Sequence, residues 1–250
     1  HYALSISAVV ALGVTTEFLQ EAFTSDRFFS VWDIFYDTLG ALTFLVLAYP
    51  SSGHPKGNIR LFKASAVLVV LLATVPTNIE IIDSWEMHRS FPLLNSFETR
   101  FEMSRLSGKD NMYMQSSKHA VHGVYALEVQ LSPGEYPGIA LEELYGDWNG
   151  YRTFSFDAYL EGGKPLPITV RINDALHNQD YTDRFNKQFV LTPGANTIVI
   201  DLYEVRKAPR KRLMDMSRIT DICIFSYRLN EPRTLFLDNF RLEKGSTRKP

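Results

Sequence analysis

The sequence predicts two parts of different fold class: an α-helical membrane part over residues 1–90 and an antiparallel β-sandwich over residues 91–245, followed by a short tail at 246–250. Three observations predict this division. Three long apolar segments stand out in the first part. After Phe91 the pattern changes to short alternating runs separated by turns, which is typical of strands. Residues 1–90 carry five Lys or Arg and eight Asp or Glu, whereas residues 91–250 carry 21 and 20, a density typical of a soluble surface.

The apolar segments of the first part lie at residues 2–20, 30–49 and 61–82. Each is close to the ~20 residues that cross the hydrocarbon core of a bilayer as a helix. Three such segments in succession, joined by short connections, favour a membrane part; a bundle of buried helices in a soluble protein is the alternative. The chain begins inside an apolar stretch without Met, so we expect further membrane helices upstream of it.

The connections between these segments predict an orientation. Residues 50–63 contain Lys56, Arg60 and Lys63 and no acidic residue, whereas residues 21–30 contain one Arg and two acidic residues. Because cytoplasmic loops are enriched in Lys and Arg, residues 50–63 are predicted to be cytoplasmic. Residues 21–30 and everything after the third segment are then predicted to lie outside.

The second part contains at least seven predicted strands and little helical patterning, which indicates an antiparallel sandwich. Turn sequences such as SPGEYPG, EGGKPLP, TPGAN and LNEPR separate the runs. The predicted strands are residues 124–131, 152–160, 167–173, 187–192, 196–202, 220–227 and 234–243.

Composition excludes several classes of protein. A net charge of −2 gives no reason to expect a nucleic-acid partner, and a single cysteine excludes an internal disulfide framework. That cysteine, Cys223, lies in the apolar run ITDICIFSY without an evident base beside it. We therefore predict a buried structural thiol and not a nucleophile.

Eight residues, most of them polar, stand at a characteristic spacing around the first loop. They are Glu17, Gln20, Phe23, Arg27, Ser30, Asp33, Asp37 and Gly40. This pattern resembles the core signature of VanZ-like membrane proteins, a family named for a member linked to glycopeptide-antibiotic resistance, and the resemblance covers residues 1–48. It implies a location in the membrane more than it implies a reaction.

The polar residues of this pattern form a predicted membrane polar cluster at the outer ends of the first two helices. Glu17 and Gln20 share a helix face, as do Asp33 and Asp37, and Arg27 is the natural counter-ion between them. Near the membrane surface such groups can reach water or a partner. The cluster is either a polar clamp that fixes the helix hairpin or a site for a polar headgroup or lipid-linked sugar.

The ends of the second part carry another resemblance. LLNSFET at 93–99, LFLDNFRLE at 235–243 and the stretch NDALHNQDYTDRFNKQFVLTPGANTIVIDL between them resemble jelly-roll carbohydrate-binding modules of the galactose-binding-like type. The resemblance covers residues 93–243 and implies an all-β jelly-roll sandwich whose first and last strands are close together. Similar modules hold a structural Ca²⁺ there, which implies Glu98 and Asp238 as metal ligands. The alternative is that both acids pair with arginines such as Arg100 and Arg241.

Two polar and aromatic stretches of the sandwich are candidates for sugar binding. Aromatic rings can serve as platforms and polar side chains can bond hydroxyl groups, although Trp and Tyr are also common core residues. His177 lacks a second His at metal-ligand spacing, so a hydrogen-bonding role is expected for it. The predicted ligand-binding residues are Tyr145, Asp147, Trp148, His177, Asn178, Tyr181, Asp183, Arg184 and Asn186.

A basic loop at residues 206–215 is the last candidate. It is either a solvated loop or a surface that attracts anionic lipid headgroups or acidic polysaccharide. The basic residues are Arg206, Lys207, Arg210, Lys211 and Arg212.

Together these features predict a non-catalytic protein of a bacterial inner membrane, whose sandwich lies in the periplasm and binds or positions an envelope glycan or lipid-linked saccharide. Membrane lipid and the glycan are the predicted partners, and Ca²⁺ is the only predicted cofactor. The alternative is a membrane enzyme or transporter that acts on a lipid-linked substrate through Glu17, Arg27 and Asp33, linked to glycopeptide-antibiotic resistance. No catalytic residues are assigned, because no nucleophile or metal-ligand spacing accompanies these groups.

Overall fold

The structure is a computed structural model that describes residues 31–48, 56–109 and 111–245. The chain divides into two compact units between Ile82 and Asp83, whereas the sequence predicted a boundary at 90/91. The first predicted membrane segment, Glu17, Gln20, Arg27 and the tail lie outside the described residues, as do the side chains of Asp33 and Asp37. The clamp and site interpretations of that cluster both stay predictions.

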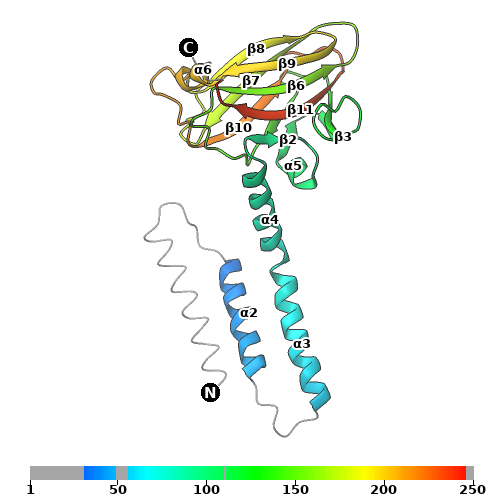
Figure 1. Cartoon of the computed structure of the whole chain (residues 1–250), viewed down its shortest axis with the longest axis vertical. Helices are drawn as coiled ribbons and strands as arrows, with labels where there is room; N and C mark the ends of the chain where they lie inside the picture. Colours follow the sequence, from blue (N-terminus) through cyan, green and yellow to red (C-terminus); the bar gives the residue numbers. More distant parts are fainter. Residues whose placement is uncertain (1–30, 49–55, 110, 246–250) are drawn as a thin grey trace. The chain divides into compact units, whose positions relative to one another are not determined.

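The first unit contains helices α2 (Val31–Ala48) and α3 (Lys56–Ala73) and the start of α4 (Val75–Ser90) (Figure 1). Helix α2 coincides with the second predicted membrane segment. The third predicted segment is divided between α3 and α4 at Thr74. Pro76 lies in the first turn of α4, where its missing N–H costs no helical hydrogen bond.

The described helices differ from a membrane span in length or in composition. No single helix among them is both long and apolar enough, and the segments Lys63–Ala73 and Asn78–Ser90, which meet at 46°, satisfy the criteria only as a pair. The predicted membrane segments therefore stay predictions.

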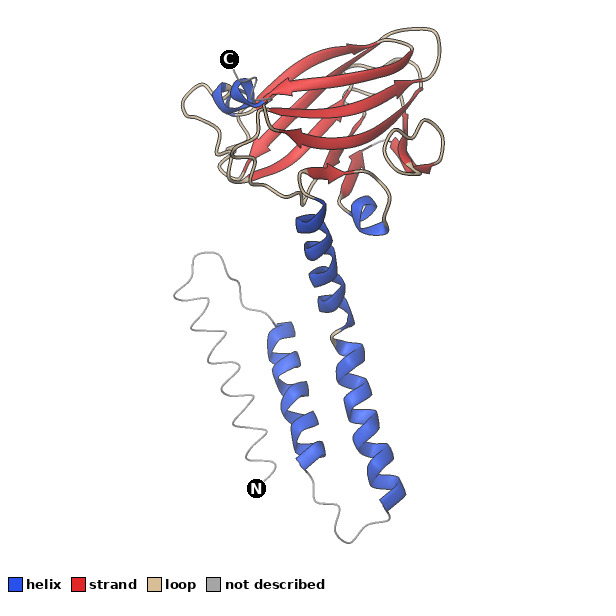
Figure 2. Ribbon diagram, in the orientation of Figure 1, coloured by secondary structure: helices blue, strands red, loops and turns tan. Residues whose placement is uncertain are grey.

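The second unit is a sandwich of two sheets whose strand pairs are all antiparallel (Figure 2), which confirms the predicted all-β sandwich. One six-stranded sheet, here called the back sheet, has the order β3-β4-β11-β6-β9, with β1 paired to β11. The other, here called the cleft sheet, has five strands in the order β2-β5-β10-β7-β8. The strands are β1 Leu93–Asn95, β2 Leu106–Lys109, β3 Asn111–Ser116, β4 Ala126–Leu131, β5 Gly138–Leu141, β6 Thr153–Leu160, β7 Leu166–Asp174, β8 Phe185–Leu191, β9 Gly194–Asp201, β10 Ile219–Phe225 and β11 Arg233–Glu243.

The seven predicted strands correspond to β4 and to β6 through β11. The sequence did not predict the short strands β1, β2, β3 and β5, or three short helical segments. These segments are α5 (Arg100–Ser104), the 3₁₀ turn η1 (Tyr181–Asp183) and α6 (Leu202–Lys207).

The core of the sandwich lies between the two sheets and follows from the alternation of side chains along each strand. In β6, Phe154, Phe156, Ala158 and Leu160 all point inward and are buried. The rings of Phe156 and Phe240 stack at 5.0 Å between centroids. The other face of each strand points away from the core. On the cleft sheet this face lines a cavity.

Candidate functional site

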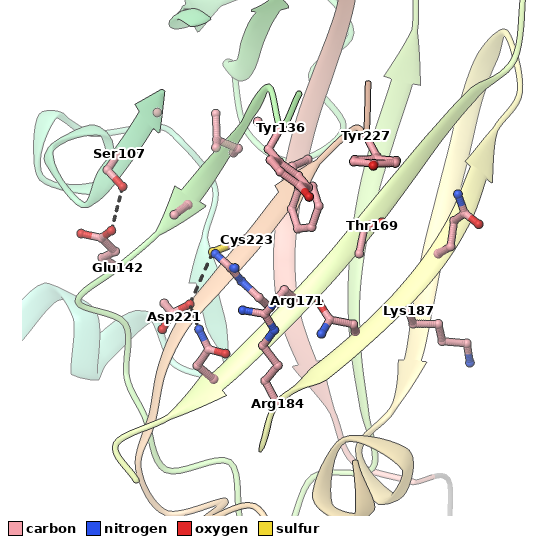
Figure 3. Close-up of a pocket in the computed structure, with 18 of the residues that line it drawn as sticks. Ser107, Tyr136, Glu142, Thr169, Arg171, Arg184, Lys187, Asp221, Cys223 and Tyr227 are labelled. Atoms are coloured by element: carbon pink, nitrogen blue, oxygen red, sulfur yellow. Dashed lines mark hydrogen bonds between the residues drawn. The ribbon is translucent and has the colours of Figure 1, made fainter. Parts of the chain in front are cut away.

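A cleft of about 1160 Å³ covers the exposed face of the cleft sheet (Figure 3). Its size exceeds the ~300–1,000 Å³ typical of pockets for one small molecule, so it has room for an oligomeric ligand. The lining residues are Ser107, Gly108, Tyr136, Gly138, Ile139, Ala140, Glu142, Thr169, Arg171, Asn173, Tyr181, Arg184, Asn186, Lys187, Gln188, Asp221, Cys223, Phe225 and Tyr227.

Strand periodicity brings these residues to one face. On β7 the core takes Val170 and Ile172, so Thr169, Arg171 and Asn173 point into the cleft. On β10 the core takes Ile222 and Ile224, and Asp221, Cys223 and Phe225 point the other way.

The register of the sheet aligns these side chains in rows across the strands. Arg171 lies opposite Cys223 on one side and opposite Asn186 on the other. Thr169 lies opposite Phe225 and opposite Gln188. The floor of the cleft therefore alternates charged, amide and apolar groups over neighbouring strands.

Three tyrosines supply exposed aromatic surface in the cleft. The rings of Tyr136 and Tyr227 lie 5.2 Å apart, and the side chain of Phe225 lies 5.9 Å from Tyr136. Tyr136, Tyr181 and Tyr227 are 57%, 68% and 49% exposed. Because large aromatic side chains are usually mostly buried, three exposed rings in one cleft indicate a binding surface.

Two arginines occupy the floor. The guanidinium of Arg171 donates to the Sγ of Cys223 at 3.1 Å, and that of Arg184 lies 5.1 Å from the centre of the Tyr181 ring. The Nε atom of each is buried without a hydrogen-bond partner. Burial lowers the pKa of Arg184, and the positive charge of Arg171 lowers it further.

The single cysteine is buried, as the sequence predicted, but it faces the cleft. Burial raises the pKa of the Cys223 thiol, and the hydrogen bond from Arg171 offsets only part of that effect. The thiol donates weakly to Oδ1 of Asp221 at 3.4 Å. This environment favours the protonated thiol and not a nucleophilic thiolate.

The connection between β7 and β8 positions Tyr181 and Arg184, and one arginine holds it in place. Arg212 binds both oxygens of Asp174 at 2.5 and 2.7 Å and donates from Nε to Asp183 at 2.7 Å. Hydrogen bonds to Asp174 and Asp183 raise the pKa of Arg212. Burial alone raises the pKa of Asp174, but the hydrogen bonds from Arg212 and from the N–H of Asp215 outweigh burial and lower it.

The residues predicted from the second polar stretch divide into two groups. Tyr181, Arg184 and Asn186 line the cleft. His177, Asn178 and Asp183 belong to the internal bonding of the connection and do not line the cleft. The His177 Nδ1 lies 3.0 Å from the carbonyl of Asp183, and the N–H of Asn178 donates to its carboxylate.

The residues predicted from the first stretch also lie away from the cleft. Trp148 is a core residue, 1% exposed, and its Nε1 donates to the carbonyl of Tyr145. Tyr145 packs against Phe91 at 4.3 Å between ring centroids. Asp147 accepts hydrogen bonds from Asn149 within its own turn. These three side chains are used in packing and turn formation.

Most of the cleft was not predicted from the sequence. The available signal was the polar residue at every second position of β7, namely Thr169, Arg171 and Asn173, which marks the exposed face of that strand. The residues missed include Tyr136, Thr169, Arg171, Asn173, Asp221 and Tyr227.

The predicted metal ligands Glu98 and Asp238 both hold the loop at residues 121–125. Glu98 Oε1 accepts the N–H groups of Val124 and Tyr125, at 2.8 and 2.7 Å. Asp238 Oδ2 accepts those of Val121 and His122, at 2.6 and 2.8 Å. A cation at these two oxygens would have to compete with amide donors that already point at them.

The calcium site stays a prediction. Among the described residues, no group of three or more His, Cys, Asp or Glu side chains is arranged to hold a metal. The alternative pairing with arginine is not seen either, since Arg241 pairs with Asp157 and Glu243.

The basic loop contributes in two different ways. Arg212 is engaged with the two carboxylates described above, so it is a structural residue. The remaining four basic side chains are exposed, which is compatible with both the solvated-loop and the anion-attracting interpretation.

Comparison with known proteins supports the fold. No family model matches the chain, the VanZ-like pattern included, and no curated protein matches it. Among solved structures, an exo-beta-agarase is similar at 14% identity and a TM-score of 0.51 over 61% of this chain and 25% of that one. The family 11 carbohydrate-binding module from Clostridium thermocellum, in complex with a beta-1,3-1,4-mixed-linked tetrasaccharide, is similar at 17% identity and a TM-score of 0.50 over 61% of this chain and 95% of that one.

These structural similarities show the fold of the sandwich. The sandwich has the jelly-roll fold of carbohydrate-binding modules. The chain spans only a quarter of the agarase that it resembles.

Proposed function

We propose that the sandwich binds a saccharide chain, without transforming it, in the cleft over the cleft sheet. The observation that carries this proposal is the combination of three exposed tyrosines with a polar floor in one large cleft. The fold shared with a carbohydrate-binding module that holds a tetrasaccharide is consistent with it.

The chemistry of the cleft suits a sugar. An aromatic ring can pack against the apolar C–H face of a pyranose, as it does against other apolar groups. The hydroxyl groups of the sugar need donors and acceptors, and the cleft offers Thr169, Asn186 and Gln188 on neighbouring strands. Such a surface provides both contact area and orientation.

Binding without catalysis is proposed because the carboxylates of the cleft have local partners. Glu142 accepts from Ser107 at 2.7 Å, and Asp221 accepts from Asn173 at 2.7 Å. Hydrolysis of a glycoside generally needs an acid and a base or nucleophile on opposite sides of the bond. If the cleft were an active site, Asp221→Asn and Glu142→Gln would abolish turnover, which a reducing-sugar assay detects.

The test of the binding proposal uses the exposed rings. Tyr136→Ala and Tyr227→Ala should each weaken saccharide binding about fivefold or more, since buried aromatic contacts are typical hot spots. The control is Tyr203→Ala, because Tyr203 is 62% exposed but does not line the cleft. Isothermal titration of the full chain against a glycan found on an array measures the effect. Equal affinity in all four proteins would refute the cleft as the binding site.

We propose as a second function that the helical part attaches the sandwich to a membrane, which in the envelope of a bacterium would place the sandwich on the periplasmic side. Several large apolar side chains on α3 are exposed, namely Leu61, Val67, Leu68, Val69, Leu71 and Leu72. The basic residues of 50–63 support a cytoplasmic end for α3. An envelope glycan or a lipid-linked saccharide would then be the ligand within reach.

Vesicle flotation tests the attachment. The full chain should float with vesicles of phosphatidylethanolamine and phosphatidylglycerol, and Leu68→Glu should reduce the floating fraction, because a charge in hydrocarbon costs several kcal/mol. Leu176→Glu is the control, since Leu176 is a comparably exposed leucine of the sandwich. A chain that stays at the bottom of the gradient contradicts the proposal.

A further inference from the structure

Two arginines of the cleft lack the partners that the chain gives to its other sheltered arginines. In residues 31–48, 56–109 and 111–245, the buried or half-buried arginines are Arg105, Arg171, Arg184, Arg212, Arg233 and Arg241. Four of these form ion pairs: Arg105 with Asp83, Arg212 with Asp174 and Asp183, Arg233 with Glu231, and Arg241 with Asp157 and Glu243. Among the described side chains, no carboxylate lies within ion-pair distance of Arg171 or Arg184.

The two unpaired groups are also neighbours. Figure 3 shows the side chains of Arg171 and Arg184 beside one another on the cleft floor, and their like charges interact unfavourably. Each Nε is buried and has no hydrogen-bond partner. Partly desolvated charges without a counter-charge are costly in a folded protein, and two together are costlier.

The other charges of the cleft do not neutralise this pair. Asp221 is bonded to Asn173 and Cys223, and Glu142 to Ser107. Lys187 has its own partner, Glu204, at 2.6 Å. The partners of Asp221 and Glu142 are neutral, so both carboxylates keep their charge, but neither forms an ion pair with Arg171 or Arg184. Among the described side chains, these two arginines are therefore the cations of the cleft without an ion-pair partner.

We propose that the cleft takes an anionic saccharide, whose acidic group binds between the guanidinium groups of Arg171 and Arg184. The planar fork of arginine matches a carboxylate, a sulfate ester or a phosphate ester, each of which accepts two parallel N–H bonds. Tyr181, under the guanidinium of Arg184, and Asn186, opposite Arg171, would contact the adjoining sugar ring. This inference rests on the proposed function and narrows its ligand class.

The experiment compares matched ligands on the full chain. An oligogalacturonate is titrated beside the same oligosaccharide after reduction of its carboxylates to alcohols, which keeps the rings and removes the charge. A sulfated dextran and its unsulfated parent form a second pair and distinguish an ester from a carboxylate as the acidic group. The charged member of at least one pair should bind about tenfold more tightly or better than its neutral member, as expected for a charge-assisted bidentate bond.

Variants assign that advantage to the two arginines. Arg171→Gln and Arg184→Gln should each remove most of the tenfold difference in affinity between the charged and the neutral member of a pair. Arg184→Lys keeps the positive charge but loses the planar guanidinium, so it should retain only part of the difference in affinity. This variant also tests the proposal if a Gln variant misfolds. Arg218→Gln is the matched control, because it removes the same charge from an exposed loop position outside the cleft.

The outcomes separate this inference from the proposed function. If the neutral and the charged member bind with equal affinity, and Tyr136→Ala weakens the binding of both, the cleft remains the saccharide site. That result would overturn the proposal that the ligand is anionic. The proposal would also be overturned if Arg218→Gln reduced the preference for the charged member as much as Arg184→Gln does. That result would indicate only a diffuse effect of charge. Failure of every saccharide, charged or neutral, would refute the proposed function itself.

Discussion

At the scale of single residues, the chemistry of the cleft depends on which face of a strand a side chain occupies. Arg171 and Cys223 lie opposite each other on neighbouring strands, between core residues such as Ile172 and Ile224. The sequence shows the alternation but does not show which strands are neighbours, since β7 and β10 are separated by two other strands and a helix along the chain. The apolar run around Cys223 therefore predicted its burial correctly. Its contact with Arg171 was not predictable, because that contact depends on which strands are neighbours.

The thiol of Cys223 offers a prediction at this scale. Because burial raises the pKa of Cys223, its thiolate fraction at pH 8 should lie well below that of a free cysteine. At pH 8 we expect iodoacetamide to alkylate Cys223 of the folded chain much more slowly than it alkylates the thiol of glutathione. The rate of alkylation of Cys223 should rise as the pH is increased further. Mass spectrometry of timed samples measures the rates. Alkylation as fast as that of glutathione would contradict the described environment.

Glu98 and Asp238 carry the calcium prediction. If a structural Ca²⁺ binds at these carboxylates, millimolar CaCl₂ should raise the melting temperature of the sandwich, because a ligand that binds only the folded state stabilises it. Asp238→Asn should abolish that rise. A melting temperature that is the same with CaCl₂ and with EDTA would mean that the two carboxylates serve only to bind the backbone N–H groups of residues 121–125.

At the scale of elements, the long strands were predictable and the short ones were not. Strand β6 shows apolar alternation over eight residues, and β11 is an eleven-residue run rich in apolar residues. The strands β1 and β5 have three and four residues, too few to establish a period. Their place in the sheet is decided by tertiary pairing with β11 and β10, which no local pattern records.

The connection between β7 and β8 positions one side of the cleft, and only some of its predicted ligand-binding residues line that cleft. Its density of polar residues indicated ligand contacts, whereas Asp183 and His177 bond within the connection. A polar loop residue that faces inward and one that faces a ligand look alike in a sequence. The deciding partner, Arg212, lies far along the chain in a loop that was expected to be solvated.

Removing one member of this ion pair should destabilise the fold. Asp174 is fully buried at its side chain, so Asp174→Asn removes the buried carboxylate that binds Arg212, leaves Asp183 as its remaining partner, and should cost about 3 kcal/mol of unfolding free energy. Urea denaturation of the full chain, followed by tryptophan fluorescence, measures the change. Asp215→Asn is the comparison, because Asp215 pairs with Arg218 at the surface and should cost much less.

The two carboxylates that bind Arg212, Asp174 and Asp183, also predict that the stability of the fold depends on pH. The pKa values of Asp174 and Asp183 are lowered in the folded state from the ordinary 3.8. Their contribution to stability is therefore complete above pH 3.8 and is lost as the pH falls through the folded-state pKa values. Asp174→Asn should flatten the loss of stability below pH 4, which urea titrations at several pH values detect. An unchanged slope in the variant would assign acid unfolding to other groups.

At the scale of the whole molecule, the sequence predicted the order of the two parts and the sandwich fold. The agreement rests on a physical contrast: long apolar runs with few charges in residues 31–82 and alternating runs with many charges after Phe91. The division at Ile82 and Asp83 falls inside helix α4, because the second half of that helix contacts the sandwich: Asp83 pairs with Arg105, and His88 packs against Tyr145. The membrane location stays a proposal, which vesicle flotation tests.

The measurement that tests the central claim most directly is saccharide binding after the cleft is filled. Thr169 lies on the cleft floor, away from the core, so Thr169→Trp should occupy the cavity without disturbing the interior. Val199→Trp adds the same side chain at an exposed position of β9 on the back sheet. In titrations of the full chain, the account predicts that Thr169→Trp abolishes binding while Val199→Trp keeps the affinity of the wild type. Undiminished binding by a folded Thr169→Trp chain would contradict it.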